Sequence, residues 1–311
     1  MIPGDATSSF LRFLEIDSNS STNTLKAYKS DIEHFFQYLG RTELSLVTPD
    51  DVVGYFSAAR ESKHYSESTF KRKLVSLRRF FAYLVQFDFC DASPMREIGL
   101  RFRSSAPLPR LIPLADLKRL LEAPILAQMN ARGLTAGRNR SKRFKALRDS
   151  AILSLLFFTG MRVGEVTKLD IRDFDSRSGS LLVHGKGRKD RMLYVRNRRL
   201  VSNIHRYLEL RLRLPGDEQA LFLNRFGQRL TPRSIQGGFG AYLRIARVKG
   251  SFTPHSMRHT MATLLLEKGT DLRTLQTILG HSSILSTQIY THVAARNVEE
   301  ALCVLGKITL P

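Results

Sequence analysis

Apolar residues recur at helical spacing over most of the first hundred positions. Residues Ser21–Gly40 begin with capping side chains, carry an apolar stripe and stop at a glycine, which predicts one helix. Thr48 is followed by a proline and two acidic residues, which predicts the start of another helix, because both features favour the first helical turn. A third helix is predicted over Ser66–Val85. The first part of the chain is therefore expected to be a small helical domain.

The helix predicted over Ser66–Val85 has two unlike faces. One face is apolar, and the rest of the helix carries five cations: Lys71, Arg72, Lys73, Arg78 and Arg79. A helix with an apolar stripe and a basic back can lie in a groove of duplex DNA. The alternative is a solvated basic face without a ligand, which is common on surface helices.

The second part of the chain mixes helices with one hairpin. The pattern predicts a helix over Leu114–Ala123 and a buried helix over residues 149–158. Between them we interpret the polar, basic stretch Asn130–Lys145 as a mobile loop. Ser180–His184 and Arg191–Val195 are typical of strands around a glycine-rich turn, and helical spacing returns after them. We therefore expect a mainly α fold, with a small antiparallel sheet among the helices of the second domain.

A proline-containing linker separates the two parts. Residues 104–113 include three prolines, which extend the chain and stop helices. Residues 1–103 hold 14 Lys and Arg against 13 Asp and Glu, a net charge of +1. Residues 104–311 hold 35 against 15, a net charge of +20. The prolines and the change in charge agree on a first domain at 1–103 and a second at 114–311.

Composition narrows the class of protein. The formal net charge of +21 over 311 residues points to a polyanionic partner, and a hydrophobic content of 42% excludes a disordered basic tail. There is no apolar run of about 18 residues and no signal-like start, so we expect no association with a membrane. Two cysteines, Cys90 and Cys303, are too few for a disulfide scaffold and favour a cytoplasmic compartment.

Two basic features suit phosphate groups. Arg162 follows the apolar helix at its predicted end, Gly160, where an unpaired guanidinium would be costly. We expect it to face Glu165, backbone carbonyls or a bound phosphate. The hairpin tip Gly185–Arg191 combines glycines with four cations: Lys186, Arg188, Lys189 and Arg191. Such a tip can bind phosphates, although charged side chains also protect an exposed hairpin from edge pairing.

A further helix is predicted to open at Pro254, where free backbone N–H groups favour an anion. His255 and Arg258 are three residues apart and share one helical face. His255 and His259 also have the i, i+4 spacing of helical zinc ligands, but no glutamate lies between them and no cysteine is near. This pattern favours an anion site over a zinc site.

Taken in order, these blocks resemble the tyrosine recombinase, or phage-integrase-like, family, in particular the Xer-type and transposon-borne recombinases of bacteria. The resemblance covers nearly the whole chain. It is carried by Thr159–Glu165, Gly185–Gly187, His255–Thr260, Leu279–His281 and Tyr290. The first domain resembles the helical core-binding, SAM-like domain of that family through Thr24–Asp31 and the basic helix.

The resemblance implies a role for each matched residue. Tyr290, which by itself would be typical of packing, would attack a DNA phosphodiester and form a 3′-phosphotyrosyl intermediate. Arg162 and Arg258 would bind the non-bridging oxygens of the reacting phosphate. His255 and His281 would add hydrogen bonds, and His255 could also take the proton of the phenol.

The remaining matched residues would support this step. Lys186 would protonate the leaving 5′-oxygen, and Glu165 would orient Arg162 or a neighbouring histidine. The other cations of the hairpin tip, together with the basic helix, would contact DNA. Because arginines take the place of a divalent ion, the resemblance implies that neither a metal nor a nucleotide cofactor is needed.

The resemblance also implies the partners. We expect duplex DNA and further copies of the chain, with a dimer on each site and a tetramer on two sites that exchange strands through a Holliday junction. Accessory proteins and a cytoplasmic, nucleoid-associated location are expected as well. The tail Val293–Pro311 could dock on the next protomer or pack on its own domain. Strand relaxation of the topoisomerase kind, and DNA binding without catalysis, are the alternative functions.

Overall fold

The chain divides into two units, Met1–Ala106 and Pro107–Pro311. The computed structural model describes residues 2–17, 20–40, 43–62, 65–96, 98–99, 110–129, 136–185, 190–195, 197–217 and 219–280. Within these residues, no helix is long and apolar enough to cross a membrane.

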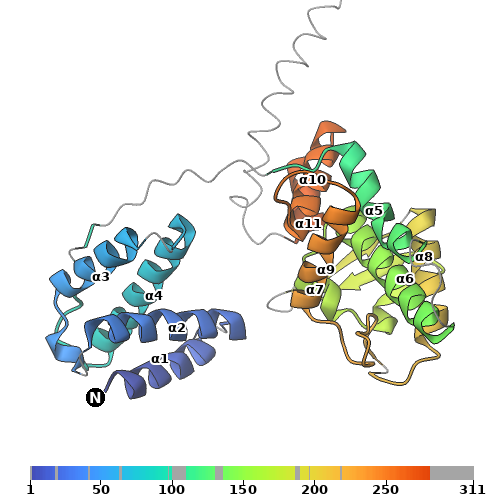
Figure 1. The fold of residues 1–311 in the computed structure, drawn as a ribbon. Helices are drawn as coiled ribbons and strands as arrows, with labels where there is room; N and C mark the ends of the chain where they lie inside the picture. The colour runs from blue at the N-terminus through green and yellow to red at the C-terminus, as the bar shows by residue number, and fades with distance from the viewer. Residues whose placement is uncertain are drawn as a thin grey trace, which may run out of the picture. The chain divides into compact units, whose positions relative to one another are not determined.

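The first unit consists of helices, as predicted, and its side-chain caps account for where they begin. Its elements are α1 (Pro3–Asp17), α2 (Thr22–Leu39), the 3-10 turn η1 (Leu44–Leu46), α3 (Pro49–Glu61) and α4 (Glu67–Gln86) (Figure 1). Ser21 caps α2 by accepting a hydrogen bond from the backbone of Thr24, and Gly40 ends that helix with a φ of 63°. Thr48 and Asp51 form a capping box at the start of α3.

An aromatic core holds these helices together. The apolar face predicted for α4 is buried, and it packs against α1 and α2. Phe10, Phe35, Phe80 and Phe81 are at most 1% exposed, and their rings meet mainly edge to face. Such contacts add to the gain from removing apolar surface from water.

One polar cluster lies inside this core. Asp31 of α2 and Lys73 of α4 are only 1% and 2% exposed. The Lys73 ammonium lies 3.5 Å from the Asp31 carboxylate and donates to the Tyr55 hydroxyl at 3.0 Å. Arg72 and Ser76 donate to the other oxygen of Asp31. The cluster therefore links α2 to α4 through the buried carboxylate, and α4 to α3 through the Tyr55 hydroxyl.

This burial corrects the prediction made for Lys73. Its ammonium is enclosed by Asp31, Tyr55 and the ring of Tyr65, 4.8 Å away, so it is not placed to contact DNA. The helical period accounts for this position, because Lys73 lies one turn from both Phe70 and Leu77 on the apolar face.

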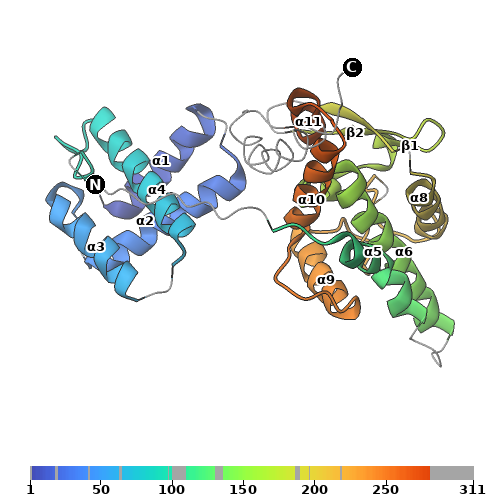
Figure 2. The ribbon, with the colours of Figure 1, turned by 90° about the horizontal axis from the view of Figure 1, so that it is seen from above.

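The second unit is built around one long helix. Its helices are α5 (Leu114–Met129), α6 (Ala136–Thr159), α7 (Val163–Lys168), η2 (Ile171–Asp173), α8 (Arg198–Arg211), α9 (Pro232–Ile245), α10 (Pro254–Glu267) and α11 (Leu272–Leu279). Helices α5, α8 and α10 all pack against α6, and α10 lies next to α11 (Figures 1 and 2). Residues 151–156 of α6 are all buried, as expected for its apolar run.

A small antiparallel sheet completes this unit and confirms the predicted hairpin. The strands β1 (Phe174–Asp175), β2 (Ser180–Val183) and β3 (Arg191–Tyr194) are hydrogen-bonded in the order β1-β2-β3. In the register between β2 and β3, Leu181 pairs with Leu193 and Val183 with Arg191. Because side chains alternate between faces, Leu193 and Arg191 point to the same side of the sheet.

Two elements of the second unit differ from the prediction. The basic stretch is not a loop over its whole length, because residues 136–145 form the first part of α6; residues 130–135 lie outside the described residues. Its charged side chains hide the helical period, so the pattern is typical of a polar loop. Helix α5 continues past Ala123 through Pro124 to Met129, held by its packing along α6.

The buried carboxylate of Asp31 is expected to stabilise the first unit strongly. Asp31→Ala leaves the buried Lys73 cation without its carboxylate, which should lower the free energy of unfolding of this unit by about 3 kcal/mol. Glu33→Ala in the same helix is the matched control, since it breaks only the exposed pair with Lys29 and should cost less than about 1 kcal/mol. Hydrogen exchange at the α2 and α4 amides measures both. Equal losses would contradict this role for Asp31.

Candidate functional site

The site is built where two helices end against each other. Helix α6 stops at Thr159 and α11 at Leu279, and each is followed by a glycine with a left-handed backbone, φ 62° at Gly160 and φ 63° at Gly280. The positive φ of Gly160 disfavours any other residue, and a Cβ there would also require the terminal methyl of Met261, 2.0 Å away, to shift. Helix C-termini carry unpaired carbonyl oxygens and a partial negative charge. The two ends therefore offer acceptors to nearby cations.

Arg258 binds both helix ends. It projects from the second turn of α10, is 3% exposed, and donates to the carbonyl oxygens of Gly160 and, at 2.8 Å, of Leu279. A buried guanidinium needs such acceptors. Carbonyl oxygens carry only partial charges, so these two contacts hold the guanidinium without cancelling its charge.

Arg162 reaches the same place from the start of α7. Its guanidinium donates to Glu165 at 2.8 Å and to the carbonyl of Gly280 at 3.5 Å, and its backbone N–H donates to the other oxygen of Glu165. Of the partners considered for Arg162, Glu165 and a backbone carbonyl are thus both present. The Arg162 side chain is 40% exposed, so a phosphate can still approach it.

Glu165 binds a second arginine, which the sequence pattern did not indicate. Arg191, at the start of β3, donates to Glu165 at 2.9 Å and to the carbonyl of Ile278 at 2.9 Å. Burial alone would raise the pKa of Glu165, but the hydrogen bonds from Arg191 and from the Arg162 backbone, with the two positive charges, lower it. Glu165 is therefore ionised at neutral pH and shared by two guanidinium groups.

These contacts correct the role predicted for Arg191. Its side chain is only 9% exposed and is engaged by Glu165 and Ile278, so it positions the site rather than contacting DNA. The strand period could have revealed this, because Arg191 lies on the buried face with Leu193 and Val195. A Cβ on Gly280 would also lie 2.8 Å from the Arg191 guanidinium, so that glycine allows the close approach.

His255 lies at the N-terminus of α10, one turn before Arg258. Its pKa is lowered by the protein packed around the ring and by the charges of Arg258 and Arg162, although the residue keeps an exposed edge. His255 is therefore neutral at pH 7 and able to accept a proton or a hydrogen bond. The pKa of His259 is also lowered, by burial and by His255 and Arg258.

The zinc alternative requires a third ligand beside His255 and His259. Among the described residues, no group of three or more His, Cys, Asp and Glu side chains is placed to hold a metal ion. The neighbours of His255 that shift its pKa are instead two cations, which would repel a metal.

Several predicted residues lie outside the described residues: Lys186, Arg188, Lys189, His281 and Tyr290. Their roles remain predictions. The described chain nevertheless reaches the residues beside two of them, since Gly185 precedes Lys186 and Gly280 precedes His281. The carbonyl of Gly280 is one of the acceptors of Arg162.

The other cations predicted to contact DNA lie on α4. Arg78 and Arg79 are exposed, Arg72 is 42% exposed, and Lys71 is half-buried. Arg72 is held by Asp31, Arg78 donates to the carbonyl of Ile98, and Arg79 lies over the ring of Tyr28. Apart from Lys73, the predicted basic face of α4 is thus accessible.

Comparison with known proteins matches both units. Residues 129–297 match the phage integrase family, and residues 8–87 match the phage integrase N-terminal SAM-like domain. The chain is 34% identical to the tyrosine recombinase XerC of Thermodesulfovibrio yellowstonii over 94% of this chain and 92% of that protein. It is 33% identical to the tyrosine recombinase XerD of Listeria innocua over 95% of this chain and 96% of that protein.

A solved structure shows the same fold. The crystal structure of the XerH site-specific recombinase bound to palindromic difH substrate, a post-cleavage complex, covers 97% of this chain and 85% of its own, with a TM-score of 0.74 and 23% identity.

The environment of His255 predicts an unusual titration. Its ring should titrate with a midpoint below the ordinary 6.5, because burial and two arginines disfavour the charged form. Arg162→Gln removes one of these charges and should move the midpoint upward. Lys168→Gln, at the other end of α7, is the matched control and should leave it unchanged. Nuclear magnetic resonance of the ring protons against pH measures all three, and a wild-type midpoint at or above 6.5 would rule out this environment.

Proposed function

Because this chain belongs to the phage integrase family and is a DNA strand-transferring tyrosine recombinase, we propose that it cleaves and rejoins DNA at a specific site through a 3′-phosphotyrosyl bond to Tyr290. The observation that carries the assignment of residues is the convergence of Arg162, Arg258 and His255 at the ends of α6 and α11. Two always-charged guanidinium groups and one neutral imidazole form a receptor for a phosphodiester.

The reaction needs a nucleophile and a means of spreading charge. The oxygen of Tyr290 attacks the phosphorus, a P–O bond to the tyrosine forms, and the bond from phosphorus to the 5′-oxygen breaks. Negative charge grows on the two non-bridging oxygens in the transition state. Arg162 and Arg258 are fixed in advance by Glu165 and backbone carbonyls, so they meet this charge with little reorganisation.

Protons move at both ends of the reacting bond. The lowered pKa of His255 keeps its ring neutral, so it can accept the phenol proton of Tyr290. Lys186 gives a proton to the leaving 5′-oxygen, and His281 adds a hydrogen bond to the phosphate. Attack by a 5′-hydroxyl of another strand then reverses the step, which exchanges strands at nearly constant bond energy.

The two units divide the work of binding DNA. The second unit supplies the catalytic groups and most of the positive charge, which should make binding steeply dependent on salt, since each neutralised phosphate releases counterions. In the first unit, the exposed Arg72, Arg78 and Arg79 of α4 and the half-buried Lys71 contact the duplex. In the second unit, Arg188 and Lys189 of the hairpin tip contact it as well. Phosphate contacts of this kind set the register, and groove contacts select the sequence.

We further propose that the chain acts as an oligomer on DNA in the cytoplasm, at the nucleoid. One structurally similar protein is a lambda integrase dimer bound to a COC′ core site. That arrangement supports two copies of this chain on each site and four copies on two sites. The relatives are recombinases, so neither strand relaxation nor DNA binding without catalysis is favoured.

The nucleophile has a direct test. Tyr290→Phe removes only the phenolic oxygen, so the variant should bind its DNA site with unchanged affinity and form no covalent adduct. Tyr38→Phe, which changes an exposed tyrosine of α2, is the matched control and should form the adduct like the wild type. A suicide duplex carrying the site found by footprinting, analysed on denaturing gels, measures the adduct. If Tyr290→Phe still formed a covalent adduct, the nucleophile would be a different residue.

A further inference from the structure

His184 joins the two ends of the hairpin tip to the body of the second unit. It follows β2 directly, and its Nδ1 lies 2.9 Å from a carboxylate oxygen of Asp190, immediately before β3. The other oxygen of Asp190 accepts the backbone N–H of Gly185 at 3.2 Å. The residues that flank the tip on both sides are therefore tied to each other.

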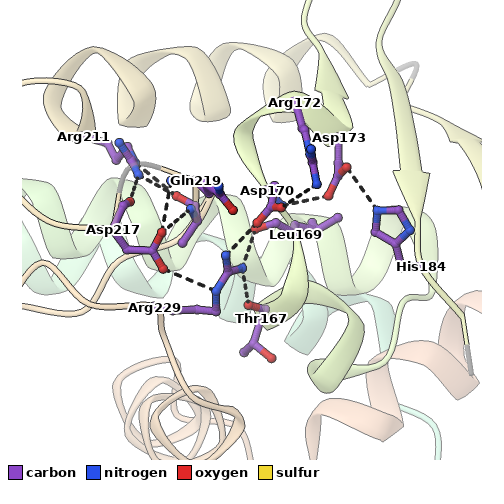
Figure 3. A network of polar contacts seen from close by, with 11 residues as sticks. Thr167, Leu169, Asp170, Arg172, Asp173, His184, Arg211, Asp217, Gln219 and Arg229 are labelled. Carbon is purple, nitrogen blue, oxygen red and sulfur yellow. Dashed lines mark hydrogen bonds and ion pairs between the residues drawn. The ribbon is translucent and has the colours of Figure 1, made fainter.

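The second nitrogen of the ring anchors this closure. Nε2 of His184 lies 3.2 Å from Asp173, whose side chain is 3% exposed (Figure 3). The other oxygen of Asp173 accepts the backbone N–H of Asp170 at 2.8 Å, and Asp170 binds Arg229 at 2.7 Å. Arg229 also donates to backbone carbonyls of Thr167 and Leu169, so the anchor belongs to a fixed network.

The protonation state of the His184 ring decides how many of these hydrogen bonds it can donate. Both partners of His184 are carboxylates, which only accept hydrogen bonds when ionised. A neutral imidazole has a single N–H and can donate to one of them, whereas the protonated ring donates to both. The contacts seen on the two nitrogens thus fit the imidazolium form.

We propose that protonated His184 is a positioning residue for strand cleavage, which holds Asp190 against Asp173 and so fixes both ends of the segment that carries Lys186. The inference rests on the proposed role of Lys186 as the group that protonates the leaving 5′-oxygen. His184 touches neither DNA nor the reacting atoms in this account. It acts through Gly185 and Asp190, the described residues on either side of the tip.

The position of the ring also predicts a dependence on pH. The hydrogen bonds to Asp190 and Asp173 raise the pKa of His184, and these two carboxylates are the charged groups that face it from the hairpin and from η2. Because the charged form is the one stabilised, the complete closure is present below this raised pKa and loses one bond as pH rises through it. Proton transfer from Lys186 to the leaving 5′-oxygen should become less efficient over the same pH range.

A substrate with sulfur in place of the bridging 5′-oxygen isolates this role. A thiolate leaves without a proton, so cleavage of the sulfur substrate does not need Lys186. Single-turnover cleavage of the oxygen and sulfur suicide duplexes is measured for the full-length wild type, Lys186→Ala, His184→Ala and Asp190→Asn. His205→Ala, which removes an exposed histidine of α8, is the matched control.

On the oxygen substrate we expect Lys186→Ala to be slower by about 100-fold or more, and His184→Ala and Asp190→Asn by about 10- to 100-fold. On the sulfur substrate all three should approach the wild-type rate, and His205→Ala should match it on both substrates. For the wild type, the cleavage rate on the oxygen substrate divided by the rate on the sulfur substrate should also fall as pH rises. This fall should be absent in His184→Ala.

The experiment distinguishes failure of the positioning role of His184 from failure of the proposed role of Lys186. If Lys186→Ala is rescued by sulfur but His184→Ala and Asp190→Asn stay slow, the two residues serve structure alone and the positioning role is overturned. If Lys186→Ala itself is not rescued, the proposed role of Lys186 is wrong, and the positioning role falls with it. Full activity of His184→Ala on the oxygen substrate would also overturn it.

Discussion

The site depends on one arrangement, in which the C-terminal ends of α6 and α11 meet and arginines from three other elements bind their carbonyl oxygens. Arg258 of α10 bridges the two ends, while Arg162 before α7 and Arg191 of β3 reach the end of α11. Unpaired carbonyls at a helix C-terminus stabilise a cation through partial charges. Three guanidinium groups are thus held close together, and Glu165 contacts two of them.

This arrangement fixes the guanidinium groups that we propose as the phosphate receptor. Buried cations usually require full counter-charges, which would compete with the substrate. Here Arg162 and Arg191 share the single carboxylate of Glu165, so one of their two positive charges stays in excess for a reacting phosphodiester. Gly160 and Gly280 belong to the same arrangement, because each has a left-handed backbone that other residues rarely adopt.

Much of the fold could be predicted from local signals, since the caps of α2, the apolar face of α4 and the hairpin of β2 and β3 each follow a short-range rule. The helical start of α6 at residues 136–145 was missed because its polar side chains carry no apolar period. Within the site, the motif predicted Arg162 and Glu165 as partners, which are three residues apart. Arg191 was misassigned because its contact with Glu165 spans 26 positions of the chain, and only tertiary packing creates it. Lys73 was misassigned because a buried cation in a basic helix resembles its exposed neighbours.

We infer that these arginines are arranged to meet the negative charge of the scissile phosphate. The test compares Arg162→Ala with the wild type on a duplex with a normal phosphodiester and on one with a neutral methylphosphonate at the cleaved position. We expect cleavage of the normal phosphodiester by Arg162→Ala to be slower than by the wild type by about 100-fold or more. On the neutral methylphosphonate, its rate should be close to that of the wild type. An equal loss on both substrates would contradict this inference, since Arg162 would then serve the structure of the site rather than the charge of the phosphate.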